Sequence, residues 1–148
     1  MTTTEELIAE VLKGFPVQKK RDRRMYLTVS RNDLIKTMNI LSAELGIQHL
    51  STITARDTGN DFEINYHFLL SGVVITIKTT CPKNDPTVES IVNVFPSAIL
   101  YEREIHDILG IVPLGHPDLR RLVLPDEWVG GYPLRKDWKQ PTEQEAEE

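Results

Sequence analysis

The residues best suited to chemistry gather in the last third of the chain. Histidine and carboxylate side chains ligate metals and transfer protons, and four of them stand here: His106, Asp107, His116 and Asp118. Their spacing matches no metal-binding motif, and the sequence offers no clear third ligand for a metal site built on them. We therefore expect hydrogen bonds and ion pairs from these side chains. A small stand-alone enzyme built on them is the alternative.

Two further carboxylates, Glu102 and Glu104, are candidates for general acid–base catalysis. Both fall in a helix that the sequence predicts from Ser97 to Leu109. Residues two positions apart on a helix do not face each other. The two carboxylates therefore cannot share a proton, and we expect no acid–base pair from them.

The segment Gly115–Arg121 reads Gly-His-Pro-Asp-Leu-Arg-Arg and predicts a rigid corner. Gly115 permits a turn and Pro117 fixes its own φ angle. The Asp118 side chain can accept hydrogen bonds from the backbone that follows. A corner of this kind holds the side chains after it in a defined direction.

Arg120 and Arg121 are the side chains that this corner would present. A guanidinium group is planar and pairs bidentately with carboxylates. We expect one of the two arginines to grip Glu102 or Glu104 and so to join the corner to the preceding helix. Direct contact with a partner protein is a second use, compatible with the first.

The segment that follows contains large aromatic and basic side chains, namely Trp128, Tyr132, Arg135, Lys136 and Trp138. Frequent glycine and proline residues argue against regular structure there. The rings must then pack on the domain or on another protein. Trp, Tyr and Arg dominate interface energetics. We expect this segment to be the main docking arm, ordered by its partner.

The rest of the chain predicts the framework. Hydrophobic periodicity and capping residues give a helix after Thr3, a strand at 25–29, a helix from Ser30 to Gly46, strands at 47–57, 62–70 and 73–77, a helix or strand at 88–95, and the helix from Ser97 to Gly110. Strict alternation in hairpin-linked strands indicates an antiparallel sheet with one covered face. We expect an α+β, two-layer domain over residues 1–111, with about four strands covered by helices on one face. An extended irregular arm over 112–139 and an acidic, disordered tail over 140–148 would follow.

Composition narrows the classes of function. The chain has 148 residues, 40% apolar and 26% charged, which is typical of one globular domain. Four of the 22 acidic residues fall in the last six positions, so the body is nearly neutral despite a net charge of −5 and gives no support to nucleic-acid binding. The single Cys81 excludes an internal disulfide and a four-cysteine metal site. The basic run Lys19–Arg24 predicts a solvated connector or a patch for an acidic partner.

The motifs of the last third resemble the signature of the 30 kDa subunit of respiratory complex I, the C subunit of the bacterial NADH-quinone oxidoreductase. That family includes the related subunit of membrane-bound hydrogenase complexes. The matching positions are Glu102, Arg103, Glu104, Asp107, Gly110, Ile111 and Gly115–Arg121.

The resemblance implies a non-catalytic subunit of a multi-protein redox complex, peripheral on the cytoplasmic side of the cell membrane. It implies contact with the large catalytic subunit that carries a quinone or nickel-iron site, and with neighbouring iron–sulfur subunits. This chain would bind no cofactor of its own and would meet the membrane only through its partners. A soluble adaptor unrelated to electron transfer is the alternative.

Overall fold

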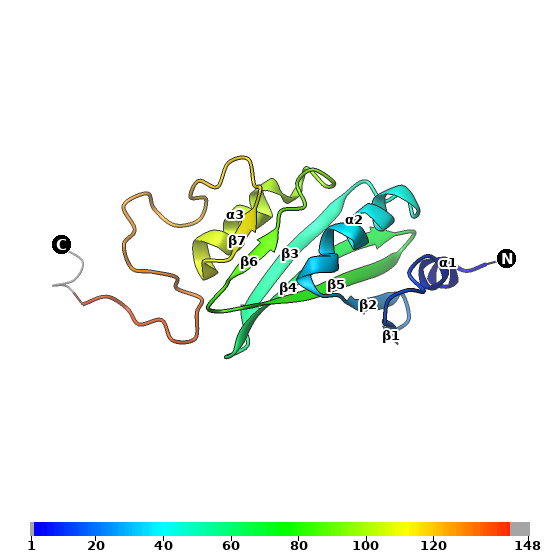
Figure 1. Ribbon diagram of the computed structural model, residues 1–148, viewed down its shortest axis with the longest axis horizontal. Helices are drawn as coiled ribbons and strands as arrows, with labels where there is room; N and C mark the ends of the chain where they lie inside the picture. The colour runs from blue at the N-terminus through cyan, green and yellow to red at the C-terminus, as the bar shows by residue number, and fades with distance from the viewer. Residues whose placement is uncertain (1, 143–148) are drawn as a thin grey trace.

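The computed structural model describes residues 2–142 of the chain. The expected acidic tail therefore lies mostly outside the described residues. The elements in chain order are α1 (Thr4–Val11), β1 (Val17–Arg21), β2 (Arg24–Thr28), a 3-10 turn η1 (Arg31–Asp33), α2 (Leu34–Ala43), β3 (Leu50–Asp57), β4 (Asp61–Leu70), β5 (Val73–Pro82), β6 (Thr87–Glu89), α3 (Ala98–Leu109) and β7 (Val112–Leu114) (Figure 1).

The main sheet has five strands in the order β1-β2-β5-β4-β3. Strands β2 and β5 run parallel, whereas the other neighbouring pairs are antiparallel. The prediction was an antiparallel sheet of about four strands, and the structure corrects it to a mixed sheet of five, with one parallel pair. The fifth strand, β1, overlaps the start of the basic run, whose residues carry no apolar alternation that would predict a strand. The parallel pair arises because the chain returns to β2 only after α2 and the β3–β4–β5 meander.

The helices cover one face of this sheet, as expected (Figure 1). Along β4, Phe62, Ile64, Tyr66 and Phe68 are fully buried and alternate with partly exposed polar residues. Burial of one face against helices, with polar side chains on the other, is the arrangement that a period of two specifies. The α+β class and the two layers are confirmed.

The predicted helix caps at Thr3 and Gly110 are confirmed, whereas the one at Ser30 is not. The Thr3 hydroxyl accepts the Glu6 N–H at 3.1 Å and the Glu6 carboxylate accepts the Thr3 N–H at 2.8 Å, a complete capping box. Gly110 ends α3 in the left-handed region with φ 76°. Ser30 does not cap α2, because η1 comes first and the Ser30 hydroxyl donates to the Asp33 carboxylate at 3.2 Å.

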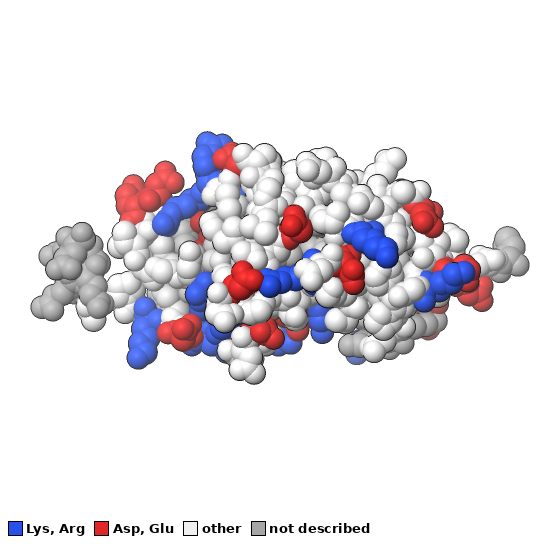
Figure 2. All heavy atoms as spheres, viewed as in Figure 1, with Lys and Arg blue, Asp and Glu red and all other residues white. Residues whose placement is uncertain are grey.

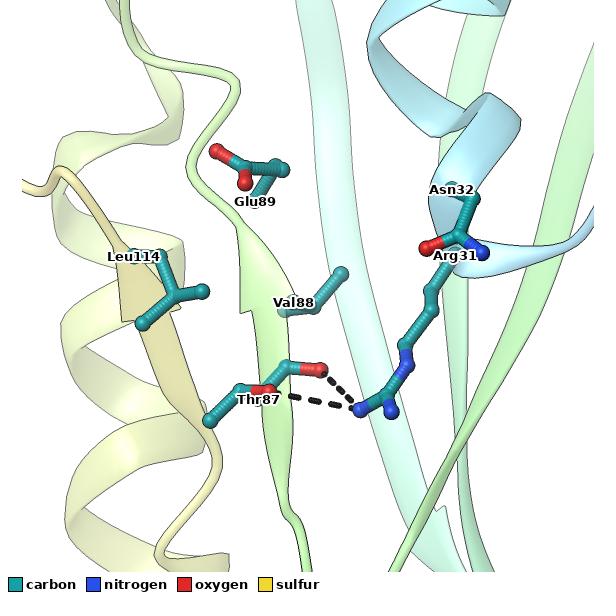
Figure 3. Close-up of a pocket in the computed structure, with 6 residues that line it drawn as sticks. All are labelled: Arg31, Asn32, Thr87, Val88, Glu89 and Leu114. Atoms are coloured by element: carbon teal, nitrogen blue, oxygen red, sulfur yellow. Dashed lines mark hydrogen bonds between the residues drawn. The ribbon is translucent and has the colours of Figure 1, made fainter.

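A second, two-stranded parallel sheet pairs β6 with β7 beside α3. The open question about residues 88–95 is settled, since only the first two of them lie in a strand. Arg31 joins η1 to this sheet through the Thr87 carbonyl at 3.1 Å and the Asp85 carboxylate at 2.7 Å. Figure 3 shows the Arg31 guanidinium against Thr87, on one wall of a shallow pocket of about 200 Å³.

Strand β7 contains the first three residues of the expected arm, so that region begins as part of the folded body. The division into a domain and an arm at residues 111 and 112 stays a prediction.

Candidate partner-docking surface

Helix α3 carries the first motif residues, Glu102 to Asp107. Its apolar face, with Ala98, Ile105 and Leu109 fully or almost fully buried, packs into the core. Two carboxylates on the same helix, Glu102 and Asp107, are also buried. A buried carboxylate needs hydrogen-bond donors, and the donors of these two define the local structure.

Glu102 is 1% exposed and binds the loop after β6. The Ser90 hydroxyl donates to one carboxylate oxygen at 2.7 Å, and the Ile91 N–H donates to the other at 2.8 Å. Burial raises the pKa of Glu102 above its usual range, although both donors act against that rise. No arginine grips this group within the described residues, so that prediction was wrong for Glu102.

The contact between α3 and the corner runs in the opposite direction from the one expected. The helix residue Arg103 donates from Nε to the Arg120 carbonyl at 2.9 Å and from Nη2 to the Arg121 carbonyl at 2.7 Å. The corner thus offers its backbone to the helix, and the helix supplies the arginine.

Asp107 completes this contact. One of its carboxylate oxygens accepts the N–H groups of Leu122, Val123 and Leu124 at 2.8, 2.8 and 3.1 Å. Burial acts to raise the pKa of Asp107, but the three donors outweigh it and hold the pKa below the usual aspartate value. Three consecutive amides around one carboxylate fix the backbone of residues 122–124 on α3.

The two corner arginines point elsewhere. Arg120 pairs with Asp118 at 2.7 Å, with 78% of its side chain exposed, and Arg121 donates to the Pro125 carbonyl at 3.2 Å. Glu104 has no hydrogen bond or ion pair in the described part of the chain. Neither arginine therefore performs the predicted grip. The turn at Gly115 is as expected, with φ 82°.

The histidines are used structurally. His116 accepts the Asp118 N–H at Nδ1, 3.0 Å away, so Nε2 carries the proton that is donated to the Ile99 carbonyl at 2.9 Å. His106 donates from Nδ1 to the Ile111 carbonyl at 3.0 Å. Across residues 2–142 no three His, Cys, Asp or Glu side chains gather as metal ligands. Of the four side chains that could ligate a metal or transfer a proton, His106, Asp107 and His116 thus bind backbone groups, and Asp118 pairs with the Arg120 side chain.

The arm is anchored at the C-terminus of α3 by Arg135. Its Nε donates to the Leu109 carbonyl at 2.7 Å, and its guanidinium lies 4.5 Å from the Tyr132 ring centre and 5.1 Å from that of Phe62. A Cβ on Gly110 would stand 2.5 Å from Arg135 Nη2. Any side chain there must displace Arg135 and Tyr132, and it would also be strained by the left-handed backbone.

A second anchor lies at Lys136, whose N–H donates to Asp57 at 2.9 Å, while Lys83 pairs with the same carboxylate at 2.6 Å. Burial acts against ionisation of Asp57, but these donors lower its pKa to about 2. Sequence reasoning missed Asp57 and Ser90, since 79 positions separate Asp57 from Lys136 and 12 separate Ser90 from Glu102. No local signal predicts either pairing.

Trp128 and Trp138 close a loop of the arm. The Trp128 indole donates to the Gly131 carbonyl at 2.7 Å and the Trp138 indole to the Gly130 carbonyl at 2.6 Å, and the two rings lie 6.5 Å apart at 22°. The rings thus pack within the arm, whereas the sequence predicted packing on the domain or on another protein. A polar cavity of about 90 Å³ separates this loop from His106, Asp107 and Arg121.

Exposed apolar side chains concentrate in the same part of the molecule. Seven of the nine large ones among the described residues lie between positions 100 and 134: Leu100, Leu114, Leu122, Val123, Val129, Tyr132 and Leu134. Figure 2 shows acidic and basic residues interspersed over one face of the molecule. We call these seven residues the apolar surface. Across residues 2–142 no helix has the length and apolar character to cross a membrane.

The chain matches the family described as respiratory-chain NADH dehydrogenase, 30 Kd subunit, over residues 27–144. It is 37% identical over 121 residues to the C subunit of NADH-quinone oxidoreductase from Moorella thermoacetica, covering 79% of this chain and 81% of the relative. It is 33% identical over 120 residues to the C subunit of F(420)H(2) dehydrogenase from Methanosarcina mazei, covering 78% and 76%. It is 45% identical over 78 residues to the C/D subunit of NADH-quinone oxidoreductase from Methylococcus capsulatus, covering 51% and 13%.

A solved structure of the membrane-bound sulfane sulfur reductase, an archaeal respiratory membrane complex, contains a similar chain. The TM-score is 0.80 at 26% identity, covering 91% of this chain and 85% of that one. The fold, the motif positions on α3 and the corner, and these similarities agree. The chain belongs to the family of the 30 kDa subunit of the respiratory-chain NADH dehydrogenase.

Proposed function

We propose that the chain is a non-catalytic subunit of a membrane-associated redox complex of the complex I or membrane-hydrogenase type. It docks on the large catalytic subunit, which carries the quinone or nickel-iron site, on the cytoplasmic side of the membrane. Iron–sulfur clusters reside in neighbouring subunits, and this chain holds no cofactor. The apolar surface is the observation that carries the proposal.

The exposure of these side chains is enforced by the structure. Leu122 and Val123 are 43% and 57% exposed while Asp107 holds their backbone amides, so neither can turn inward without breaking those bonds. Apolar groups that are fixed in water favour burial by a partner. A concentration of such groups in one part of a molecule marks a protein interface more often than a solvent-facing surface.

Two further observations support the proposal. The titratable side chains of the motifs hold α3, the corner and the arm together. Such contacts are typical of a subunit with a structural role. The relative from Methylococcus capsulatus is named as a C/D subunit, a name that joins two subunits in one chain, and the match covers 13% of it. Such a joined chain favours direct contact between a member of this family and the neighbour to which it is joined.

The proposal is tested with Leu122→Asp combined with Val123→Asp in the full chain, co-expressed with the large subunit of its own complex. Two buried charges at a hot spot should weaken assembly by at least about 2 kcal/mol, seen as loss of co-elution in size-exclusion chromatography. The matched control is Leu7→Asp, at a residue 46% exposed on α1, at the opposite end of the molecule (Figure 1). Normal assembly of the double variant would remove Leu122 and Val123 from the interface.

A further inference from the structure

The loop from Trp128 to Trp138, here called the indole loop, is closed by its own side chains. Each indole N–H donates to a glycine carbonyl, from Trp128 to Gly131 and from Trp138 to Gly130. The two acceptors are neighbours in the chain, so the two rings bracket one short stretch of backbone. A closed ring of this kind needs no partner to form.

Packing within the indole loop leaves no room at its centre. A Cβ on Gly130 would lie 2.7 Å from the Trp128 ring and 3.2 Å from Pro141. Real Cβ atoms do not approach ring carbons so closely, so the absence of a side chain at Gly130 leaves the space that the Trp128 ring occupies. The loop therefore takes its shape partly from the absence of a side chain at this position.

The base of the loop is fixed to α3. The Leu134 N–H donates to the Ile108 carbonyl at 3.1 Å, and Arg135 donates to the Leu109 carbonyl at 2.7 Å. The last carbonyls of a helix have no partner within the helix, and here the arm supplies their donors. The loop thus has a fixed position as well as a fixed shape.

The stretch between the first tryptophan and the anchoring arginine is uncharged, Val-Gly-Gly-Tyr-Pro-Leu. Its three large side chains face water: Val129 is 74% exposed, Leu134 57% and Tyr132 38%. The Tyr132 ring already stacks on Arg135. Val129 and Leu134 are the two that have no comparable use within the described residues.

We propose that the indole loop is a preformed anchor that inserts Val129 and Leu134 into an apolar depression of the large subunit. Trp128, Trp138 and Gly130 shape the loop and do not contact the partner. This inference rests on the proposed docking function and names the residues that carry it. A preformed loop loses little freedom on binding, which favours tight association from few contacts. The expectation that the arm is ordered by its partner is replaced by an arm that is ordered in the free protein.

The first test concerns the free protein. The chain has two tryptophans, so its NMR spectrum has two indole N–H signals. Both should exchange slowly with solvent, and Gly130→Ala should make both exchange at least tenfold faster, because the new methyl group displaces the Trp128 ring. Two indole signals that exchange at the rate of free tryptophan in the unchanged protein would overturn the preformed loop.

The second test concerns assembly with the co-expressed large subunit. Val129→Asp and Leu134→Asp should each weaken assembly roughly 30-fold or more, the loss typical of hot-spot residues. The indole signals of both variants should stay as in the unchanged protein, which separates lost contact from lost folding.

The outcomes distinguish the two proposals. If both single variants assemble normally while Leu122→Asp with Val123→Asp does not, the anchor is wrong and the docking function stands. If all of these variants assemble normally, both proposals fall. Loss of assembly in the Val129 and Leu134 variants with intact indole signals supports the anchor.

Discussion

Replacing Arg135 by alanine removes one of the groups that hold the arm on α3. The side chain donates to the Leu109 carbonyl at 2.7 Å and lies over two aromatic rings, at 4.5 Å from the Tyr132 centre and 5.1 Å from that of Phe62. It also brings a positive charge to the C-terminus of a helix, where the partial charge is negative. The structure predicts that Arg135→Ala weakens the attachment of the arm at the end of α3 without disturbing the sheet.

The magnitude follows from these contacts. A hydrogen bond from a charged donor contributes about 1.5–3 kcal/mol, and each cation–π contact at a partly exposed site about 0.5–1 kcal/mol. The contributions share one guanidinium group and do not add fully, so the arm should be destabilised by about 2–4 kcal/mol. At roughly 1.4 kcal/mol for each factor of ten, local opening should increase roughly 30- to 700-fold.

Amide hydrogen exchange measures this opening at one position. The Leu134 N–H is bonded to the Ile108 carbonyl at 3.1 Å only while the arm lies on α3. Its exchange should accelerate by the factor above in Arg135→Ala, whereas amides of β4 should not change. Arg135→Lys keeps the charge but not the planar fork, so the Leu134 N–H in that variant should exchange at a rate between those in the unchanged protein and in Arg135→Ala.

Arg120→Ala is the matched control. This arginine pairs with the Asp118 carboxylate at 2.7 Å, yet 78% of its side chain is exposed. Exposed ion pairs contribute little. If Leu134 exchanges at the same rate in Arg135→Ala as in Arg120→Ala, the anchor at the end of α3 is refuted.

Three more predictions concern the carboxylates and the glycine of α3. The raised pKa of Glu102 contributes stability at low pH that is lost as pH rises through the folded-state pKa, so Glu102→Gln should flatten this part of the stability–pH curve in urea unfolding. The lowered pKa of Asp107 contributes stability above the usual aspartate range that is lost as pH falls, and Asp107→Asn should cost about 1–3 kcal/mol at neutral pH, with the acid-side slope reduced. Gly110→Ala should lower the free energy of unfolding by about 1–2 kcal/mol, because residue 110 has a left-handed backbone with φ 76°. The loss should be larger while Arg135 is present, since a Cβ at position 110 meets its guanidinium. Melting curves of Gly110→Ala, Arg135→Ala and the double variant should show this coupling.

Several features could be predicted because their causes are local. The Thr3 capping box, the amphipathic α3 and its stop at Gly110 each depend on residues within one or two helical turns. The alternation of β4 identified its buried face. The motif positions that indicated the family lie in a short stretch and are read directly from residue types and gaps.

Other features were decided by the tertiary structure. The parallel pairing of β2 with β5 brings together strands that the sequence separates by a helix and two further strands. The predicted grip by Arg120 or Arg121 was wrong. Arg103 instead binds backbone carbonyls of the corner, and Asp107 binds the backbone amides that directly follow it. Every residue carries a carbonyl and all but proline an amide N–H, so no residue type marks such a partner.

The docking arm also combines features that the sequence predicts with features that only the tertiary structure determines. The sequence located its aromatic and basic residues and indicated that the rings needed contacts. It did not determine that the two indoles close one loop between them, or that the Lys136 amide meets Asp57 from 79 positions away. Residue types determine what a side chain can bind. Which group it meets depends on the path of the whole backbone, since contacts between distant segments exist only after the sheet and α3 have brought them together.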